Sequence, residues 1–258
     1  MKNHVVLYIV LVLCLLGCEK TKKEEVQKEA EAVENEAVPT KVEKKKMPSF
    51  VYGIDISMFQ GNEMNTLSKQ KDSLDFIICK ATEGVTYTDP KFSYNWKTIK
   101  EKSFVRGAYH FYRSEDDPIS QAANFLNAIA TIDPTDLPPI IDFEEAGIDA
   151  SQSVPDVQSN LKIFINEIEK KLKRTPIIYT DIPVGNKYLN DASFAKYPLW
   201  IANYDGKETP DLPDTWKEKG WKMWQKSDHY KTDGTTDDFD VFNGSLQDLK
   251  GFIKNSHR

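Results

Sequence analysis

Apolar and polar positions divide the chain into three stretches. Residues 1–18 hold an unbroken apolar run, 5–16, that follows a positive start at Lys2. Residues 19–48 contain no aromatic residue, no Leu and no Ile. From residue 49 onward, short apolar runs alternate with stretches of helix-like periodicity. We therefore expect one folded domain over 49–258, preceded by two segments of different kinds.

The third stretch predicts eight strands, at 51–56, 75–80, 104–111, 139–143, 176–179, 199–202, 221–225 and 239–242. Helices are expected near 90–102, 117–131 and 155–173. The last of them carries apolar residues at helical spacing, namely Val157, Leu161, Phe164, Ile165, Ile168 and Leu172. Alternation of strands and helices indicates a parallel sheet or barrel. Short polar loops separate the last strands, so the barrel should be regular at first and irregular at its end.

The first eighteen residues are typical of a secretory signal. A membrane-spanning helix needs ~20 apolar residues, and the shorter run here has the length of a signal h-region. It ends in Leu15-Leu16-Gly17-Cys18, which resembles the bacterial lipobox. That motif implies lipidation of Cys18 and stable anchoring by several acyl chains. The expected location is the cell envelope, with the folded domain outside the cytoplasm. An ordinary signal peptide with a chance cysteine is the alternative.

Residues 19–48 have the composition of a tether. They hold eight Lys and eight Glu. Such a segment cannot bury enough apolar surface to offset the entropy lost on ordering. We expect a disordered spacer between the anchor and the domain.

Composition excludes some classes of function. A hydrophobic content of 40% and a charged content of 29% are ordinary for a soluble domain with a sizeable core. The net charge of −6 argues against a nucleic-acid partner, which favours a basic face. With Cys14 in the signal and Cys18 at the lipobox, only Cys79 remains in the domain, where we expect an inert core thiol.

Signatures of cofactor chemistry are missing from the sequence. The four histidines are scattered and do not form a metal motif. A glycine-rich phosphate loop and a G-x-S-x-G elbow do not occur. We therefore expect neither a metal nor a cofactor.

Polar residues follow the ends of the predicted strands. In α/β barrels, residues at the carboxyl ends of the strands face the active site. The candidates in this chain are Asp55, Glu83, Tyr109, His110, Asp142, Glu144, Asn203 and Asp240.

Asp142 and Glu144 form the most informative pair. At i and i+2 of a strand, their side chains share one face, and their backbones lie ~6.6 Å apart along the strand. Two carboxylates this close cannot both ionise freely, so one pKa should rise. A glycosidase needs this asymmetry of one acid and one anion. Glu145 follows directly, so a solvated acidic turn is the alternative; the apolar Ile140-Ile141 before the pair favours a site.

The other strand-end residues allow two interpretations each. Asp55 is either a third carboxylate of the same cavity or a turn or helix N-cap residue. Glu83 is either a sugar ligand or a loop charge, and His110 is more often a core residue than a catalyst. Aromatic residues at strand ends can stack on sugar faces, although they more often belong to the core: Tyr109, Tyr179, Trp200 and Trp224.

These segments, taken together, resemble glycoside hydrolase family 25, the Chalaropsis-type lysozymes. The matching segments cover about 50–247 in collinear order. They are YGIDIS (52–57), FIICKATEG (76–84), DPKF (89–92), GAYHF (107–111), IDFE (141–144), IIYT (177–180), LWIA (199–202), WQ (224–225) and the ending FDVFNG (239–244).

The resemblance implies a fold and a reaction. The fold is an irregular α/β barrel of the TIM type, with about five strand–helix units and three trailing strands. The reaction is hydrolysis, with retention, of the β-1,4 bond after N-acetylmuramic acid in peptidoglycan. By motif position, Glu144 resembles the general acid, and Asp142 resembles the residue that assists the substrate's N-acetyl group or stabilises an oxocarbenium-like state. Asp55 and Asp240 resemble further carboxylates of the cavity.

Other features accompany this interpretation. The residues expected to bind the glycan strand are Glu83, Tyr109, Tyr179, Trp200, Asn203 and Trp224, and we expect a monomer. The tether and anchor depart from the many relatives that are freely secreted. The charged stretch 226–230 also departs from the family pattern and leaves the far subsites open.

Two other functions are compatible with the same residues. A chitinase-like hydrolase also uses an Asp-x-Glu strand end, but usually carries further aspartates at the positions that Pro138 and Ile140 occupy here. An inactive lipoprotein that binds the cell wall is the second alternative, against which the intact Asp142 and Glu144 argue.

Overall fold

The computed structural model describes residues 49–232 and 235–257. The predicted signal peptide, the predicted lipidation site at Cys18 and the predicted tether lie outside the described residues. In the part that is described, none of the helices has the length and apolar character needed to cross a membrane.

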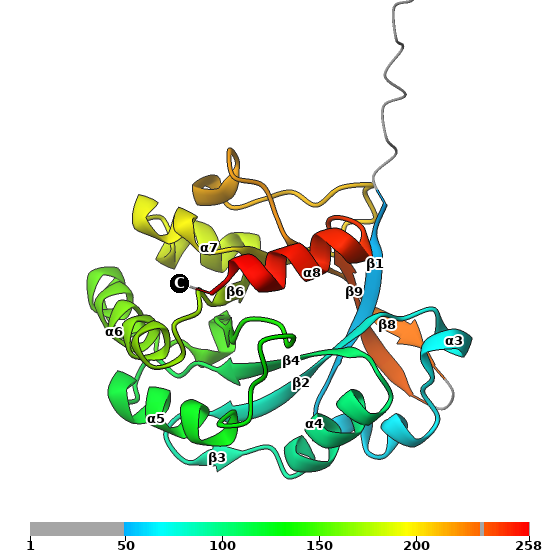
Figure 1. Cartoon of the computed structure of the whole chain (residues 1–258). Coiled ribbons are helices and arrows are strands. Elements are labelled where there is room, and N and C mark those ends of the chain that lie inside the picture. Colours follow the sequence, from blue (N-terminus) through cyan, green and yellow to red (C-terminus); the bar gives the residue numbers. More distant parts are fainter. Residues whose placement is uncertain (1–48, 233–234, 258) are drawn as a thin grey trace, which may run out of the picture. The chain divides into compact units, whose positions relative to one another are not determined.

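The strands close into an eight-stranded barrel (Figure 1). Its strands are β1 Val51–Ile56, β2 Phe76–Glu83, β4 Val105–Phe111, β5 Ile140–Asp142, β6 Ile177–Thr180, β7 Leu199–Ala202, β8 Met223–Lys231 and β9 Thr236–Phe242. Each strand pairs in parallel with the next one in the series β1, β2, β4, β5, β6, β7 and β8. The last strand, β9, pairs antiparallel with both β8 and β1 and so closes the barrel. A short strand, β3 (Tyr87–Thr88), adds to the end of β2. The predicted irregular α/β barrel is confirmed, including its three trailing strands.

Helices connect the early strands and cover the outside of the barrel. They are α3 Lys69–Asp72, α4 Phe92–Glu101, α5 Pro118–Ala128, α6 Val154–Leu172 and α7 Ile182–Tyr188. Single 3₁₀ turns interrupt the loops: η1 Met58–Gln60, η2 Glu63–Asn65, η3 Glu145–Gly147, η4 Ala192–Lys196 and η5 Asp214–Trp216. Side chains of Asp117, Ser153 and Asp181 accept hydrogen bonds from the first turns of α5, α6 and α7, which fixes where these helices begin.

Alternating side chains give the strands two buried faces. In β5, Ile140 packs inside the barrel with Phe76 and Ile177, whereas Ile141 packs outside, in the layer that holds the buried face of α6. Cys79 is buried in this outer layer, as expected for a core thiol. The apolar interior is confined to the end of the barrel where the parallel strands begin. The opposite end receives the polar side chains.

A C-terminal helix that the hydrophobic pattern did not predict closes the apolar end of the barrel. This helix, α8 (Leu246–Asn255), lies across the barrel near the start of β1 (Figure 1). It inserts Leu249 and Ile253 into the interior cluster. Gly53 is needed nearby, since a Cβ atom there would lie 2.3 Å from the ring of Phe76. Apolar side chains therefore fill the barrel interior at this end, and the polar side chains inside the barrel lie at the other.

Candidate active site

A cavity of about 260 Å³ opens at the carboxyl ends of the parallel strands. It contains three of the four predicted carboxylates and three of the predicted substrate-binding residues. Its lining residues are Asp55, Tyr109, Asp142, Glu144, Tyr179, Trp200, Tyr204, Gln225 and Asp238. Residues more than 180 positions apart in sequence therefore face the same space.

Asp142 and Glu144 enter this cavity from the end of β5. Phe143, between them, points outward and packs against the rings of Tyr112 and Tyr188. Glu144 keeps an extended backbone, with φ −138° and ψ 167°, so the alternation of the strand continues past its last paired residue. The two carboxylates thus lie on the same side of the chain, as their spacing predicts.

Burial controls the charge of this pair. Burial, with the neighbouring charge of Glu144 adding to it, raises the pKa of Asp142 well above the usual range. Burial and the charge of Asp181 likewise raise the pKa of Glu144. Oδ1 of Asp142 is buried without a hydrogen-bond partner in the described chain, which is rare for a polar atom unless a ligand serves it. A carboxyl group that keeps its proton to a higher pH than usual can act as a general acid.

Asp55 is held by a network centred on Gln225. The Gln225 amide donates a hydrogen bond of 2.7 Å to Oδ2 of Asp55. Its carbonyl oxygen accepts hydrogen bonds from the hydroxyl groups of Tyr179 and Tyr204. Gln225 therefore fixes the orientation of one acidic and two aromatic residues of the cavity. Burial and the charge of Asp238 raise the pKa of Asp55.

Asp240 lies deeper, below the cavity wall. It is fully buried, and its Oδ1 accepts a hydrogen bond of 2.9 Å from Nε1 of Trp200. Burial and the charge of Asp55 raise its pKa. This position agrees with the prediction that Asp240 belongs to the carboxylate cluster. Asp240 is not, however, among the residues that line the open cavity.

Asp238 is a cavity residue that the sequence analysis missed. It pairs with Asp55 in the β1–β9 register. Burial, together with the charge of Asp228, raises its pKa to about 6. The predicted strand began at Phe239, one residue too late. β9 begins at Thr236, so Asp238 and Asp240 lie on the same face of the strand by simple alternation. This alternation in the sequence could have identified Asp238 as a site residue.

Glu83 lies at the rim of the site, in an ion network. It accepts a hydrogen bond of 2.6 Å from Lys80 and pairs with Arg113. Burial opposes its ionisation, but these cations more than offset that effect and lower its pKa. The two cations also counteract the rise in the pKa of Glu144. Glu83 is thus already occupied by protein partners.

Two further candidates, Trp224 and His110, do not line this cavity. Trp224 points outward because it lies between the inward-facing Met223 and Gln225; its ring packs edge-on against Trp221, and its Nε1 donates to the Asn203 carbonyl. Its predicted contact with sugar is therefore not supported by its position. His110 is buried outside the barrel between Thr82 and Gln121, as expected for a core histidine.

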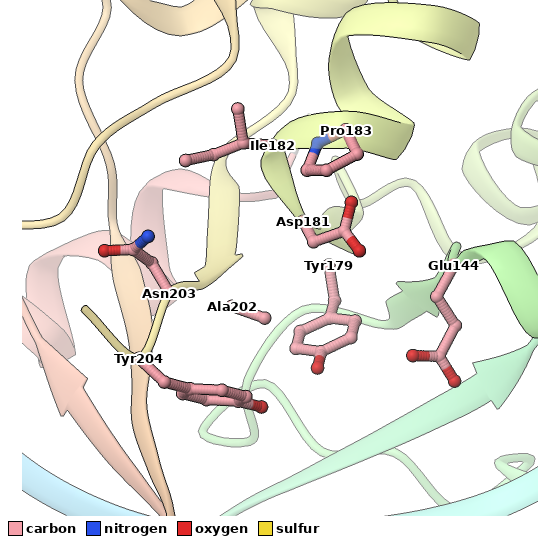
Figure 2. A pocket seen from close by; sticks show the side chains of 8 residues that line it. All are labelled: Glu144, Tyr179, Asp181, Ile182, Pro183, Ala202, Asn203 and Tyr204. Atoms are coloured by element: carbon pink, nitrogen blue, oxygen red, sulfur yellow. The ribbon is translucent and has the colours of Figure 1, made fainter.

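Asn203 belongs to a second cavity, of about 320 Å³, which adjoins the first. We call it the α7 cavity, because two of its residues come from the first turn of that helix. Figure 2 shows its wall, with Glu144 and Asp181 on one side, Asn203 and Tyr204 on the other, and Tyr179 between them. The full lining is Glu144, Tyr179, Asp181, Ile182, Pro183, Ala202, Asn203 and Tyr204.

The fold and these cavities together define a class of protein. Carboxylates with raised pKa values and aromatic walls lie at the carboxyl end of an α/β barrel, the end that carries the active site in such barrels. A carboxylate pair of this kind is the machinery of glycoside hydrolases. Within the described residues, no group of three or more His, Cys, Asp and Glu side chains is arranged to hold a metal ion.

Comparison with known proteins identifies the family. The model of Glycosyl hydrolases family 25 matches residues 54–235, and the chain belongs to this family. It is 32% identical over 209 residues to "Uncharacterized protein YegX" of Escherichia coli (strain K12), covering 79% of this chain and 73% of that protein. It is 29% identical over 226 residues to "Lysozyme M1" of Streptomyces globisporus, covering 81% and 73%. The crystal structure of a bacterial lysozyme from Streptomyces coelicolor matches with a TM-score of 0.71 and 28% identity, covering 81% of this chain and 99% of that one.

Proposed function

We propose that the protein is a peptidoglycan muramidase. It hydrolyses the β-1,4 bond between N-acetylmuramic acid and N-acetylglucosamine and retains the configuration of the anomeric carbon. The observation that carries this proposal is the placement of Asp142 and Glu144 side by side in one cavity, with a buried Asp142 oxygen that has no partner in the described chain. The relative named Lysozyme M1 supports the choice of substrate.

The reaction proceeds in two steps. In the first, protonated Glu144 gives its proton to the glycosidic oxygen while the substrate's acetamido oxygen bonds to the anomeric carbon and the glycosidic bond breaks. Asp142, as an anion, stabilises the positive charge that develops on the acetamido group. In the second, Glu144 takes a proton from water as the water oxygen bonds to the anomeric carbon. The bond between that carbon and the acetamido oxygen breaks at the same time, which restores the N-acetyl group. Each step inverts that carbon, so the β-configuration is restored.

Product analysis tests this function. Purified peptidoglycan treated with the protein should give fragments with N-acetylmuramic acid at the reducing end by mass spectrometry, and NMR should show the β-anomer first. An α-anomer as the first product would rule out this mechanism. Cleavage of chitin without cleavage of peptidoglycan would favour the chitinase-like alternative, and binding without cleavage would favour the inactive lipoprotein.

The proposed location is the membrane of the bacterial cell envelope, through lipid on Cys18. Cys18→Ser should release the protein from the membrane fraction, because the mutant cannot be acylated. Cys14→Ser, four residues earlier within the apolar run, is the matched control and should remain with the membrane. Fractionation of cells followed by immunoblotting measures both variants. A Cys18→Ser protein that stays wholly in the membrane fraction contradicts the lipobox interpretation.

We also propose that the enzyme acts as a monomer, since one chain supplies both cavities.

A further inference from the structure

A surface groove of about 700 Å³ lies at the amino end of the barrel. Helix α8, which lies across this end (Figure 1), contributes Ile253 to the lining, and the start of β4 contributes Val105. Tyr109, four residues further along β4, lines the cavity that contains Asp142. The groove and the catalytic cavity therefore lie at opposite ends of the same strand.

The groove combines an apolar lining with positive charge. Val105, Pro134 and Ile253 provide apolar surface, and Lys250 and Lys254 lie one helical turn apart on α8. Both lysines are exposed, and within the described residues neither pairs with a carboxylate. An exposed apolar surface bordered by polar groups is typical of sites that bind a membrane or another protein.

The carboxylates beside the groove do not neutralise these lysines. Asp133 and Asp136 flank two of the lining residues in the loop before β5. Asp136 pairs with Arg106 at 2.8 Å, and Asp133 pairs with Arg106 at 3.2 Å and also with Lys100. The two lysines of α8 are therefore available for an anion from outside the chain. Because the whole chain has a net charge of −6, attraction to an anionic surface must come from a local patch of this kind.

The groove lies at the end of the barrel where the chain enters the domain. The first strand, β1, starts at this end, and Val51 packs there with Leu249 and Ile253. The proposed membrane anchor at Cys18 is therefore connected to the domain through residues that enter at this end. A membrane in contact with the groove would lie at the opposite end of the barrel from the catalytic cavity.

We propose that this groove is a docking surface for anionic phospholipid in a bilayer. Lipid phosphate groups pair with Lys250 and Lys254, and the apolar lining receives the acyl-chain carbons nearest the headgroup. Docking at this end directs the catalytic cavity away from the bilayer, towards the peptidoglycan that we propose as substrate. The surface acts independently of the lipid on Cys18, because all of its residues belong to the barrel domain.

Vesicle binding by the barrel domain alone tests this surface. Residues 48–258 form one compact unit with its own hydrophobic core, so they can be produced without the anchor. The domain should sediment with vesicles that contain phosphatidylglycerol and phosphatidylcholine in equal parts. It should bind vesicles of pure phosphatidylcholine far more weakly, and added salt should weaken the binding to the anionic vesicles.

A double substitution removes the positive charge of the groove. Lys250→Gln with Lys254→Gln should weaken binding to the anionic vesicles by roughly 25-fold, because each lysine near such a surface contributes about fivefold. Lys226→Gln with Lys231→Gln is the matched control. It removes the same charge from exposed positions of β8, beyond the carboxyl end of the barrel, and should bind the vesicles normally.

Thr135 offers a test that leaves α8 unchanged. This residue lines the groove and is exposed. Thr135→Glu adds a negative charge there, whereas Thr135→Gln adds a side chain of similar size without charge. Only the Glu variant should lose binding to the anionic vesicles. Both variants should keep the wild-type melting temperature and the wild-type hydrolysis of soluble peptidoglycan fragments, since the groove is remote from the catalytic cavity.

The outcomes separate this surface from other occupants and from the proposed activity. Equal binding of the wild-type domain to both kinds of vesicle overturns the proposal, as does undiminished binding by the folded Lys250 and Lys254 double variant. Light scattering that shows a dimer abolished by Thr135→Glu, without vesicle binding, would assign the groove to a second copy of the chain. Hydrolysis of soluble fragments tests the muramidase function separately, so either proposal can fail while the other stands.

Discussion

Replacing Glu144 by Gln is expected to lower kcat on peptidoglycan by roughly 10²–10⁴-fold, the usual contribution of a general acid. Glutamine has nearly the same shape and fills the same place between the two cavities, but it cannot donate an acidic proton to the glycosidic oxygen. The fold and the binding of the glycan should persist, so KM should change far less than kcat. Turbidity loss of a peptidoglycan suspension and release of reducing ends measure the effect.

The pH profile adds a second readout for Glu144. Burial and Asp181 raise the pKa of this carboxyl group, so the wild-type enzyme keeps its acid protonated to a higher pH than an ordinary glutamate would. Activity should fall as the pH rises through that raised pKa. The residual activity of Glu144→Gln should lack this alkaline fall, because the titrating group is gone.

The neighbouring residue supplies the control for this substitution. Glu145 is exposed and lines neither cavity, so Glu145→Gln should retain normal activity and the normal pH profile. Near-normal activity of Glu144→Gln on peptidoglycan would show that another group donates the proton.

Local periodicity predicted much of the barrel. Each of the eight predicted strands overlaps an observed one, because strands buried on both faces appear in the sequence as short apolar runs. The pair Asp142 and Glu144 was found by the same means, since alternation along a strand needs no tertiary information. The buried stripe of α6 followed from helical spacing.

The direction in which a side chain points was harder to predict. Trp224 and Gln225 are adjacent near the start of β8, and the aromatic residue was the one predicted to contact the sugar. The barrel turns Gln225 inward, because Met223 fills the interior cluster two positions earlier. The choice between the two faces depends on which neighbours fill the barrel, and a single strand does not contain that information.

Elements that depend on distant partners were missed for a related reason. The strands β8 and β9 extend beyond the predicted 221–225 and 239–242 into a hairpin. Residues 226–231 are mostly polar there, and the two strands support each other through pairs such as Tyr230 and Phe239, whose rings stack 4.7 Å apart. The charged stretch that departs from the family pattern is this extension of β8. Asp238 was not predicted as a site residue because the predicted strand began after it, at Phe239.

Asp142→Asn should combine a large loss of activity with an unchanged or higher melting temperature. The anion at this position stabilises developing positive charge in a site shielded from water, and removal of one such interaction costs about 10²–10³-fold in kcat. Stability should move the other way. The pKa of Asp142 in the folded protein is raised by burial, so ionisation near neutral pH opposes folding. The contribution of Asp142 to the stability of the fold is fully present below its unfolded-state pKa. It is lost as the pH rises through the folded-state pKa.

A neutral asparagine removes this pH-dependent loss at Asp142. Circular dichroism melts at pH 7 should therefore show Asp142→Asn at least as stable as the wild type, and the difference should shrink as the pH is lowered toward the unfolded-state pKa. Asp214→Asn is the control; this side chain is 72% exposed and pairs only at the surface with Lys217, so neither activity nor stability should change appreciably. If Asp142 is retained for function although it lowers stability, its replacement by Asn should give both the loss of activity and the equal or higher melting temperature. An Asp142→Asn protein that melts well below the wild type while retaining activity would instead assign this carboxylate to the scaffold.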